Sequence, residues 1–283
     1  MPEKSEAPEE MDKAATKSAK ELAYLHDLYV ATDWIERCAE HIDKALVLPE
    51  DGQFLYGECG TGAHVLDLRE KLKDAVEVYA TESDEERFRI AQSKAAAVAA
   101  EIHFQNSYPH ELNFPVSTFG TVICDASFLQ TSRLLAVWQE IHRVLESEGS
   151  AAFVLPTAGS FGDFFSVMWE ALHNLELDEL GAQVEDLIKS LPTVSDVEDT
   201  ARNAGFNQIE SNTGIEIFEY ETGRDFLRSP LVQDFLYPVW TQSIPAGEQV
   251  KLLRQIEKVI NESRDDLSFQ LTVKITLVVA KKD

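Results

Sequence analysis

The chain has 283 residues, of which 44% are hydrophobic, and a formal net charge of −25. This length suits one large domain or two modest ones, and the excess of carboxylates argues against a nucleic-acid-binding or membrane-surface protein, because both functions need clustered Lys and Arg. No apolar run approaches the ~20 residues that span a bilayer, so we expect no membrane insertion.

The N-terminal residues and the cysteines favour a cytoplasmic protein. The first ten residues, MPEKSEAPEE, lack the basic and apolar pattern of a secretory signal. Cys38, Cys59 and Cys124 lie far apart and cannot all pair, which favours a reducing compartment. The histidines show no metal-ligand spacing with them, so we expect no metal. Residues 1–18, rich in Glu, Lys, Ala, Ser and Pro, predict a disordered tail.

The remainder, residues 19–283, predicts a single α/β domain. Apolar residues recur at helical spacing over 19–46, which indicates one or two amphipathic helices. Apolar runs and helical segments then alternate, and this alternation predicts a parallel sheet with right-handed crossovers. The expected strands are 53–57, 76–81, 101–105, 119–125 and 150–155, and the expected helices are 63–72, 84–99 and 131–146.

After Pro156 the pattern changes. Residues 157–190 predict an aromatic, mostly helical insert, and residues 223–264 predict a second helical insert. Between them we expect a helix from Ser195 to Gly205, with Ser195 and Glu198 as its capping box, and a strand over 208–219. A long alternating strand over 268–280 ends the domain.

A glycine-rich turn carries the strongest functional signal. The run Gln53-Phe-Leu-Tyr-Gly-Glu-Cys-Gly-Thr-Gly62 passes from a strand into a turn, a helix follows, and Glu82 ends the next strand twenty residues after Gly62. Strand, glycine turn, helix, strand and acid together typically hold a nucleotide-type cofactor. The glycines let the backbone approach the ligand, and the acid accepts hydrogen bonds from the ribose hydroxyls.

These segments resemble the class I S-adenosylmethionine-dependent methyltransferase family in its small-molecule "type 11" form. The resemblance covers about residues 50–155 by motif. It is carried by the cofactor-binding turn 55–62, the second-strand tip 78–84, the adenine-reading segment 104–108, the fourth strand 119–125 and the turn 143–149 before the fifth strand. The family's fold is a Rossmann-like seven-stranded mixed sheet of order 3-2-1-4-5-7-6, here expected with helical lid inserts.

The resemblance implies S-adenosylmethionine as the cofactor. It places the cofactor against Tyr56, Gly57, Glu58, Cys59, Gly60, Gly62, Glu82, Ser83, Asn106, Ser107 and Asp125.

Three of these positions depart from the family pattern. Tyr56 stands in place of the acid at the end of the first strand, Glu58 replaces the first glycine, and Ser107 replaces the acid that contacts the adenine amine. A carboxylate at 58 either repels the carboxylate of the cofactor's methionine part or attracts its ammonium group and replaces the acid lost at Tyr56.

No catalytic residue can be assigned, because methyl transfer from a sulfonium mainly requires alignment and exclusion of water. A general base matters only for a hydroxyl or an acidic carbon. His110 and Asp125 follow strands on the expected ligand-binding rim. For His110 the alternative is a solvated loop histidine, and for Asp125 it is ordinary loop polarity.

The aromatic inserts are either a lid over the substrate or core filling and a dimer surface. As a lid they predict a small, apolar substrate, because inserts after the later strands stand at the carboxyl rim of the sheet. The candidate substrate-contacting residues are His110, Phe161, Phe165, Trp169, Tyr237 and Trp240.

Three functions are therefore open: a methyltransferase acting on a small molecule, a catalytically inactive methyltransferase-like binding or regulatory protein, and an NAD-type dehydrogenase. The dehydrogenase is disfavoured because the glycines do not follow its Gly-x-Gly-x-x-Gly spacing. A homodimer is possible in each case.

Overall fold

The structure, a computed structural model, describes residues 17–262 and 268–283. The predicted tail over 1–18 therefore lies almost entirely outside the described residues, as do positions 263 and 264 of the second helical insert.

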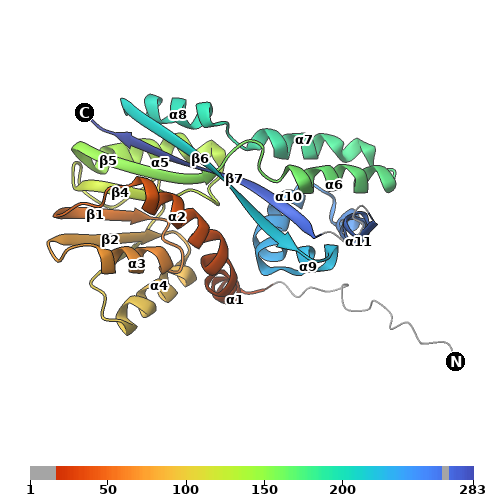
Figure 1. Cartoon of the computed structure of the whole chain (residues 1–283), viewed down its shortest axis with the longest axis horizontal. Coiled ribbons are helices and arrows are strands. Elements are labelled where there is room, and N and C mark those ends of the chain that lie inside the picture. The colour runs from red at the N-terminus through yellow and green to blue at the C-terminus, as the bar shows by residue number, and fades with distance from the viewer. Residues whose placement is uncertain (1–16, 263–267) are drawn as a thin grey trace.

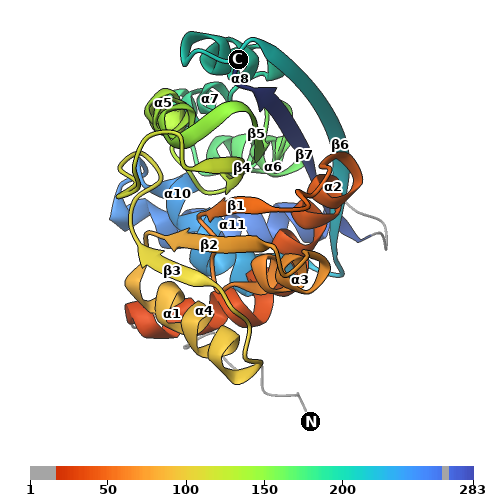
Figure 2. The ribbon, with the colours of Figure 1, turned by 90° about the vertical axis from the view of Figure 1, so that its left-hand side faces the viewer.

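A seven-stranded mixed sheet forms the centre of the molecule (Figures 1 and 2). Its strands are β1 (Gly52–Gly57), β2 (Val76–Glu82), β3 (His103–Asn106), β4 (Phe119–Asp125), β5 (Leu145–Pro156), β6 (Gln208–Tyr220) and β7 (Phe269–Lys281). The order is β3-β2-β1-β4-β5-β7-β6, and β7 runs antiparallel to both of its neighbours. The predicted Rossmann-like topology is confirmed.

Helices cover both faces of this sheet. They are α1 (Ala19–Leu25), η1 (His26–Ile35), α2 (Glu36–Ala45), α3 (Ala63–Lys71), α4 (Glu85–Ala97), η2 (Thr131–Arg133), α5 (Leu134–Val144), α6 (Gly162–Asn174), η3 (Asp178–Leu180), α7 (Gly181–Ser190), α8 (Val194–Asn203), α9 (Gly223–Arg228), η4 (Leu231–Leu236), α10 (Tyr237–Thr241) and α11 (Ala246–Glu262). Segments η1 and η4 are π-helical.

The core consists of two hydrophobic clusters, one on each face of the sheet. Successive residues of a strand point to opposite faces, and β1 accordingly gives Phe54 and Tyr56 to one cluster and Leu55 to the other. The first cluster also takes in α6, α9 and α11, which pack around the half of β7 that extends beyond β5. Figure 1 shows these helices grouped around the far ends of β6 and β7.

The start of α8 differs from the predicted helix start. The helix begins at Val194, capped by Thr193, and the reciprocal capping bonds join Thr193 to Asp196. The prediction from Ser195 and Glu198 was wrong by two residues, because Thr-x-x-Asp offers the same hydrogen-bonding groups as Ser-x-x-Glu at almost the same place.

Strand register brings three strand ends together. Tyr56 of β1 lies beside Ala80 of β2, and Gly57 lies beside Cys124 of β4. The residues after these pairs, on the carboxyl edge of the sheet, therefore lie next to each other. Within the described part of the chain, no helix is long and apolar enough to cross a membrane.

Candidate cofactor site

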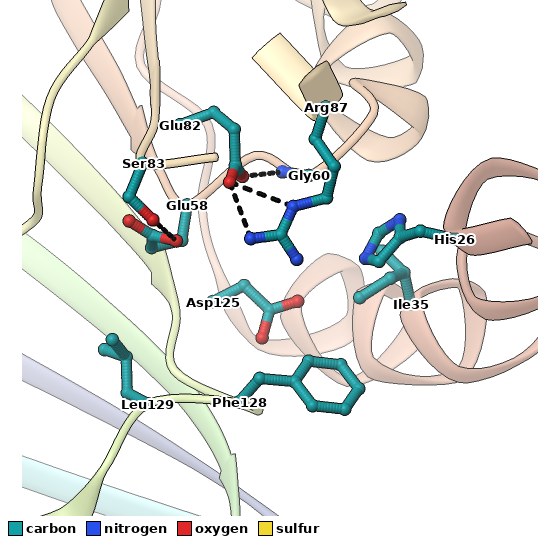
Figure 3. A pocket seen from close by; sticks show the side chains of 10 residues that line it. All are labelled: His26, Ile35, Glu58, Gly60, Glu82, Ser83, Arg87, Asp125, Phe128 and Leu129. Atoms are coloured by element: carbon teal, nitrogen blue, oxygen red, sulfur yellow. Dashed lines mark hydrogen bonds and ion pairs between the residues drawn. The ribbon is translucent and has the colours of Figure 1, made fainter. Parts of the chain in front are cut away.

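A cavity of about 140 Å³ lies at the carboxyl ends of β1, β2 and β4 (Figure 3). Its walls come from the glycine-rich turn, the tip of β2, the first turn of α4, the segment after β4 and the overlying helix η1. The residues that line it are His26, Ile35, Glu58, Gly60, Glu82, Ser83, Arg87, Asp125, Phe128 and Leu129.

The turn after β1 has a conformation that favours glycine. Glu58 has a φ of 54° and Gly60 a φ of 59°, both in the left-handed region that L-residues with a Cβ seldom adopt. At Gly60 a Cβ would also stand 2.9 Å from Cε1 of His26, so a side chain there would collide with η1. The Cys59 amide donates to the Thr81 carbonyl at 2.9 Å and holds the turn against β2.

Glu82 is buried, and both oxygens of its carboxylate accept hydrogen bonds. Its carboxylate accepts hydrogen bonds from the amides of Gly60 and Asp84, each at 2.8 Å. The Arg87 guanidinium adds contacts at 3.1 Å from Nε and 2.8 Å from Nη2. Burial raises the pKa of Glu82, and Arg87 opposes that rise. The predicted ribose-binding acid therefore stands at the expected place, paired with an arginine.

Glu58 carries a carboxylate that is only half satisfied. One oxygen, Oε2, accepts from the Ser83 hydroxyl at 2.9 Å, and the other, Oε1, is buried without a partner. Burial raises the pKa of Glu58 to about 8, and the nearby carboxylate of Glu82 adds to the rise. An unpaired buried carboxylate oxygen is costly, and a cationic or hydrogen-bond-donating ligand would relieve it.

Asp125 and His26 complete the polar lining. The Asp125 carboxylate accepts from the Ser127 amide at 2.9 Å, and burial raises its pKa. The His26 side chain is 2% exposed and its Nδ1 has no partner. Burial, with the positive charge of Arg87, lowers the pKa of His26 to about 3, so the ring is neutral at physiological pH.

Five of the predicted cofactor-binding residues meet at this cavity: Glu58, Gly60, Glu82, Ser83 and Asp125. Three others belong to the surrounding framework. Gly57 packs against Cys124, Gly62 precedes α3, and Asn106 donates to the carbonyls of Glu82 and Ser83. Cys59 is buried and burial raises its pKa, so the thiol form prevails despite the nearby helix start. Ser107 is buried, and its hydroxyl has no partner.

Tyr56 points away from the cavity. Its hydroxyl lies 3.0 Å from Nδ1 of His64, and Nε2 of His64 lies 3.2 Å from Asp43. Burial raises the pKa of Tyr56, so the hydroxyl keeps its proton and donates it to Nδ1. This residue ties β1 to α3 and α2.

None of the six candidate substrate residues lines the cavity. Phe161, Phe165 and Trp240 form a buried aromatic group within the first core cluster, and Tyr237 is buried beside them. Trp169 is 37% exposed and packs over Gly181. His110 lies 2.9 Å from Arg133. Four buried residues of the inserts, Phe161, Phe165, Tyr237 and Trp240, therefore pack in the first core cluster and not around the cavity.

Sequence reasoning missed five lining residues: His26, Ile35, Arg87, Phe128 and Leu129. Phe128 and Leu129 follow Asp125 at the end of β4, and Arg87 lies in the first turn of the helix that follows β2. Their positions just after a strand could therefore have indicated them. His26 and Ile35 come from a helix distant in sequence, which an ion pair at 2.8 Å between Asp27 and Lys94 attaches to α4.

Comparison with protein families gave one match: residues 57–149 fit the model described as "Methyltransferase domain". A comparison with curated protein sequences gave no significant match.

Similar solved structures share the fold at low sequence identity. A putative methyltransferase from Bacillus halodurans is 15% identical with a TM-score of 0.58, covering 86% of this chain and 98% of that one. A Haemonchus contortus phosphoethanolamine N-methyltransferase, solved with phosphomonomethylethanolamine and S-adenosylhomocysteine, is 13% identical with a TM-score of 0.55, covering 94% and 59%. The [4+2]-cyclase SpnF is 16% identical with a TM-score of 0.51, covering 87% and 80%.

The sheet order and these likenesses together define the fold. The fold is that of class I S-adenosylmethionine-dependent methyltransferases, and residues 57–149 carry the methyltransferase-domain pattern within it. The cofactor of this class is S-adenosylmethionine. The antiparallel β7 between β5 and β6 departs from the 3-2-1-4-5-6 order of dinucleotide-binding sheets, which disfavours the NAD-type dehydrogenase.

The polar groups of the cavity fit such a cofactor, whereas the volume requires movement. Unpartnered atoms at Glu58 and His26 offer an acceptor for a cation and a hydrogen-bonding ring nitrogen. The volume of about 140 Å³ is below the roughly 300–1,000 Å³ of ligand pockets, and Arg87 occupies the carboxylate that would face the ribose.

Proposed function

We propose that the protein is an S-adenosylmethionine-dependent methyltransferase that acts on a small molecule at the carboxyl edge of β1, β2 and β4. The observation that carries the proposal is the convergence of Glu58, Glu82 and Asp125 on one cavity beside a left-handed turn. The bound cofactor supplies an electrophilic methyl group on a sulfonium.

The chain's own residues would bind and orient the reactants. Glu82 would hold the ribose hydroxyls, as its place at the tip of β2 supports, after Arg87 has moved from its carboxylate. Glu58 would face the positively charged end of the cofactor. Asp125, whose pKa is raised by burial, would accept a proton from a hydroxyl or carbon substrate.

The apolar residues of the cavity wall favour a substrate with an apolar portion. Ile35, Phe128 and Leu129 are the apolar side chains of the lining, and Figure 3 shows Phe128 and Leu129 on the side of Asp125 away from Glu82. An apolar wall would exclude water and align a small substrate with an apolar portion. This wall supports the small, apolar substrate expected from the sequence, which Ile35, Phe128 and Leu129 would contact in place of the aromatic inserts.

Calorimetric titration with S-adenosylmethionine tests the proposal. We expect binding to the wild type and an at least tenfold loss in Glu82→Gln, because the amide cannot accept charge-assisted hydrogen bonds from both ribose hydroxyls. Glu77→Gln is the matched control, since Glu77 is exposed on the same strand. Equal affinity in all three proteins would contradict the assigned role of Glu82.

A second function, a catalytically inactive binding protein, is favoured by the Arg87–Glu82 ion pair and the small cavity. Arg87→Met separates the two. If the ion pair only competes with the ribose, the variant binds the cofactor about tenfold more tightly. The control Arg89→Met, on the exposed side of the same helix, leaves affinity unchanged. Failure of both wild type and Arg87→Met to bind any adenosyl compound would favour the inactive protein.

A further inference from the structure

The cavity is lined by more acidic groups than basic ones. Its ten lining residues include three carboxyl groups, those of Glu58, Glu82 and Asp125, and one guanidinium, that of Arg87. The guanidinium is paired with the Glu82 carboxylate, at 3.1 Å from Nε and 2.8 Å from Nη2. The remaining titratable group of the lining, the His26 imidazole, is neutral because burial lowers its pKa to about 3.

Two buried polar atoms in the lining have no hydrogen-bond partner within the described part of the chain. Glu58 leaves Oε1 buried and without a hydrogen bond, and His26 leaves Nδ1 in the same state on the opposite wall. Figure 3 shows the His26 ring facing the Arg87 guanidinium across the cavity, with the Glu58 carboxylate beside Ser83. Buried polar atoms are rarely left unpaired unless a water, ion or ligand satisfies them.

We propose that this cavity selects ligands by positive charge, and that Glu58 is the residue that makes it prefer the sulfonium form of the cofactor to its neutral thioether product. The inference rests on the proposed function. Both compounds carry the same adenosine, ammonium and carboxylate groups, so their difference in affinity isolates the charge on sulfur.

The protonation state of Glu58 links the affinity for a cationic ligand to pH. Because the pKa of Glu58 is raised to about 8, most of its side chains are protonated at neutral pH when no cation is bound. A cation stabilises the carboxylate form, so its binding expels a proton. The affinity for the sulfonium therefore rises with pH up to the pKa of the free site and then levels off, whereas the affinity for the thioether does not rise.

Groups around Glu58 belong to three other elements. Glu82 of β2 and Asp125 of β4 raise its pKa, and Arg87 of α4 lowers it. Glu82 and Asp125 also have raised pKa values, caused by burial, so a pH dependence alone would not identify the responsible carboxyl group. The experiment therefore needs a variant at position 58.

Isothermal titration calorimetry of the full chain with S-adenosylmethionine and S-adenosylhomocysteine tests the inference. Titrations in buffers of different ionisation enthalpy count the protons released. We expect the wild type to bind the sulfonium about 10- to 100-fold more tightly than the thioether at about pH 8. We also expect a proton released below about pH 8 with the sulfonium only. Protons from the ligand's own amino group appear equally in every variant.

Glu58→Gln is the decisive variant. It keeps the acceptor for Ser83 and removes the charge, so we expect the two ligands to bind with similar affinity and the extra proton release to vanish. Glu85→Gln, at an exposed position in α4, should behave as the wild type.

The other possible results would overturn either the charge selection or the proposed function. Equal affinities in the wild type, or a preference that persists in Glu58→Gln, overturn the charge selection and leave the proposed function standing. If neither compound binds to the wild type or to Arg87→Met, the proposed function fails and the inference fails with it.

Discussion

At the residue scale, Glu58 combines two unfavourable features. Its backbone has a φ of 54°, a conformation that costs a non-glycine residue on the order of 1 kcal/mol. Its carboxylate is buried beside that of Glu82, and one oxygen lacks a partner. Strain and perturbed pKa values concentrate at functional sites, which agrees with the role proposed for this residue.

The raised pKa of Glu58 makes stability depend on pH. Between about 4.5, the unfolded value, and about 8, the folded value, the folded chain holds the Glu58 proton more tightly than the unfolded chain does. The free energy of unfolding therefore falls as pH rises through this window. We expect Glu58→Gln to be more stable than the wild type near pH 9, by at most about 5 kcal/mol.

Urea unfolding of both proteins near pH 5 and pH 9 checks this prediction. The two should have nearly equal stability near pH 5, where Glu58 is largely protonated in the folded chain. A gain that is the same at both pH values would show that the carboxyl charge is not its cause.

Tyr56 is a second residue whose role depends on the direction of its side chain. The resemblance to the methyltransferase family placed it against the cofactor, whereas its hydroxyl donates to Nδ1 of His64 at 3.0 Å. Tyr56→Phe leaves Nδ1 of His64 buried without a donor, and we expect a loss of roughly 1–3 kcal/mol in stability with no change in cofactor affinity.

Tyr79→Phe is the control, because the Tyr79 hydroxyl contacts only the exposed Glu77 carboxylate. Thermal unfolding and calorimetric titration together give both readouts. A Tyr56→Phe variant with normal stability and weakened cofactor binding would indicate that Tyr56 contacts the cofactor, as the family resemblance implies.

At the scale of elements, local hydrogen bonding fixes where α8 begins. Thr193→Ala removes the side-chain acceptor for the Asp196 amide, and we expect it to cost about 1 kcal/mol. Ser195→Ala, two residues later within the helix, should change stability by no more than about 0.5 kcal/mol. Urea unfolding measures both, and a larger loss in Ser195→Ala would favour the helix start that the sequence suggested.

The strands and the glycine turn were predictable for a local reason. Their hydrophobic runs, glycines and terminal acids repeat at short range, and the parallel topology follows from the alternation. The inserts were less predictable, because aromatic residues such as Phe161 and Trp240 suit a lid and a core equally well. Their burial among α6, α10 and β7 was decided by packing between segments far apart in the sequence.

At the scale of the whole molecule, the net charge of −25 bears on stability. Like charges repel one another more strongly in the compact state than in the extended chain, and salt screens this repulsion. We expect the melting temperature to rise between about 0.01 M and 0.15 M NaCl. Choline chloride should have the same effect if screening is responsible. A melting temperature that falls in both salts would indicate that ion pairs outweigh the repulsion.

The amino-acid sequence by itself determined the strands and the position of Glu58, Gly60, Glu82 and Asp125 at the carboxyl edge, because short-range patterns fix which residues follow which strand. The strand order was implied by the resemblance to the methyltransferase family. Only the tertiary structure decided what faces those residues. Helix η1 brings His26 to Gly60, Arg87 turns back onto Glu82, and Tyr56 turns away toward His64. Such choices depend on burial, charge and the free volume between segments, and these quantities exist only once the chain has packed.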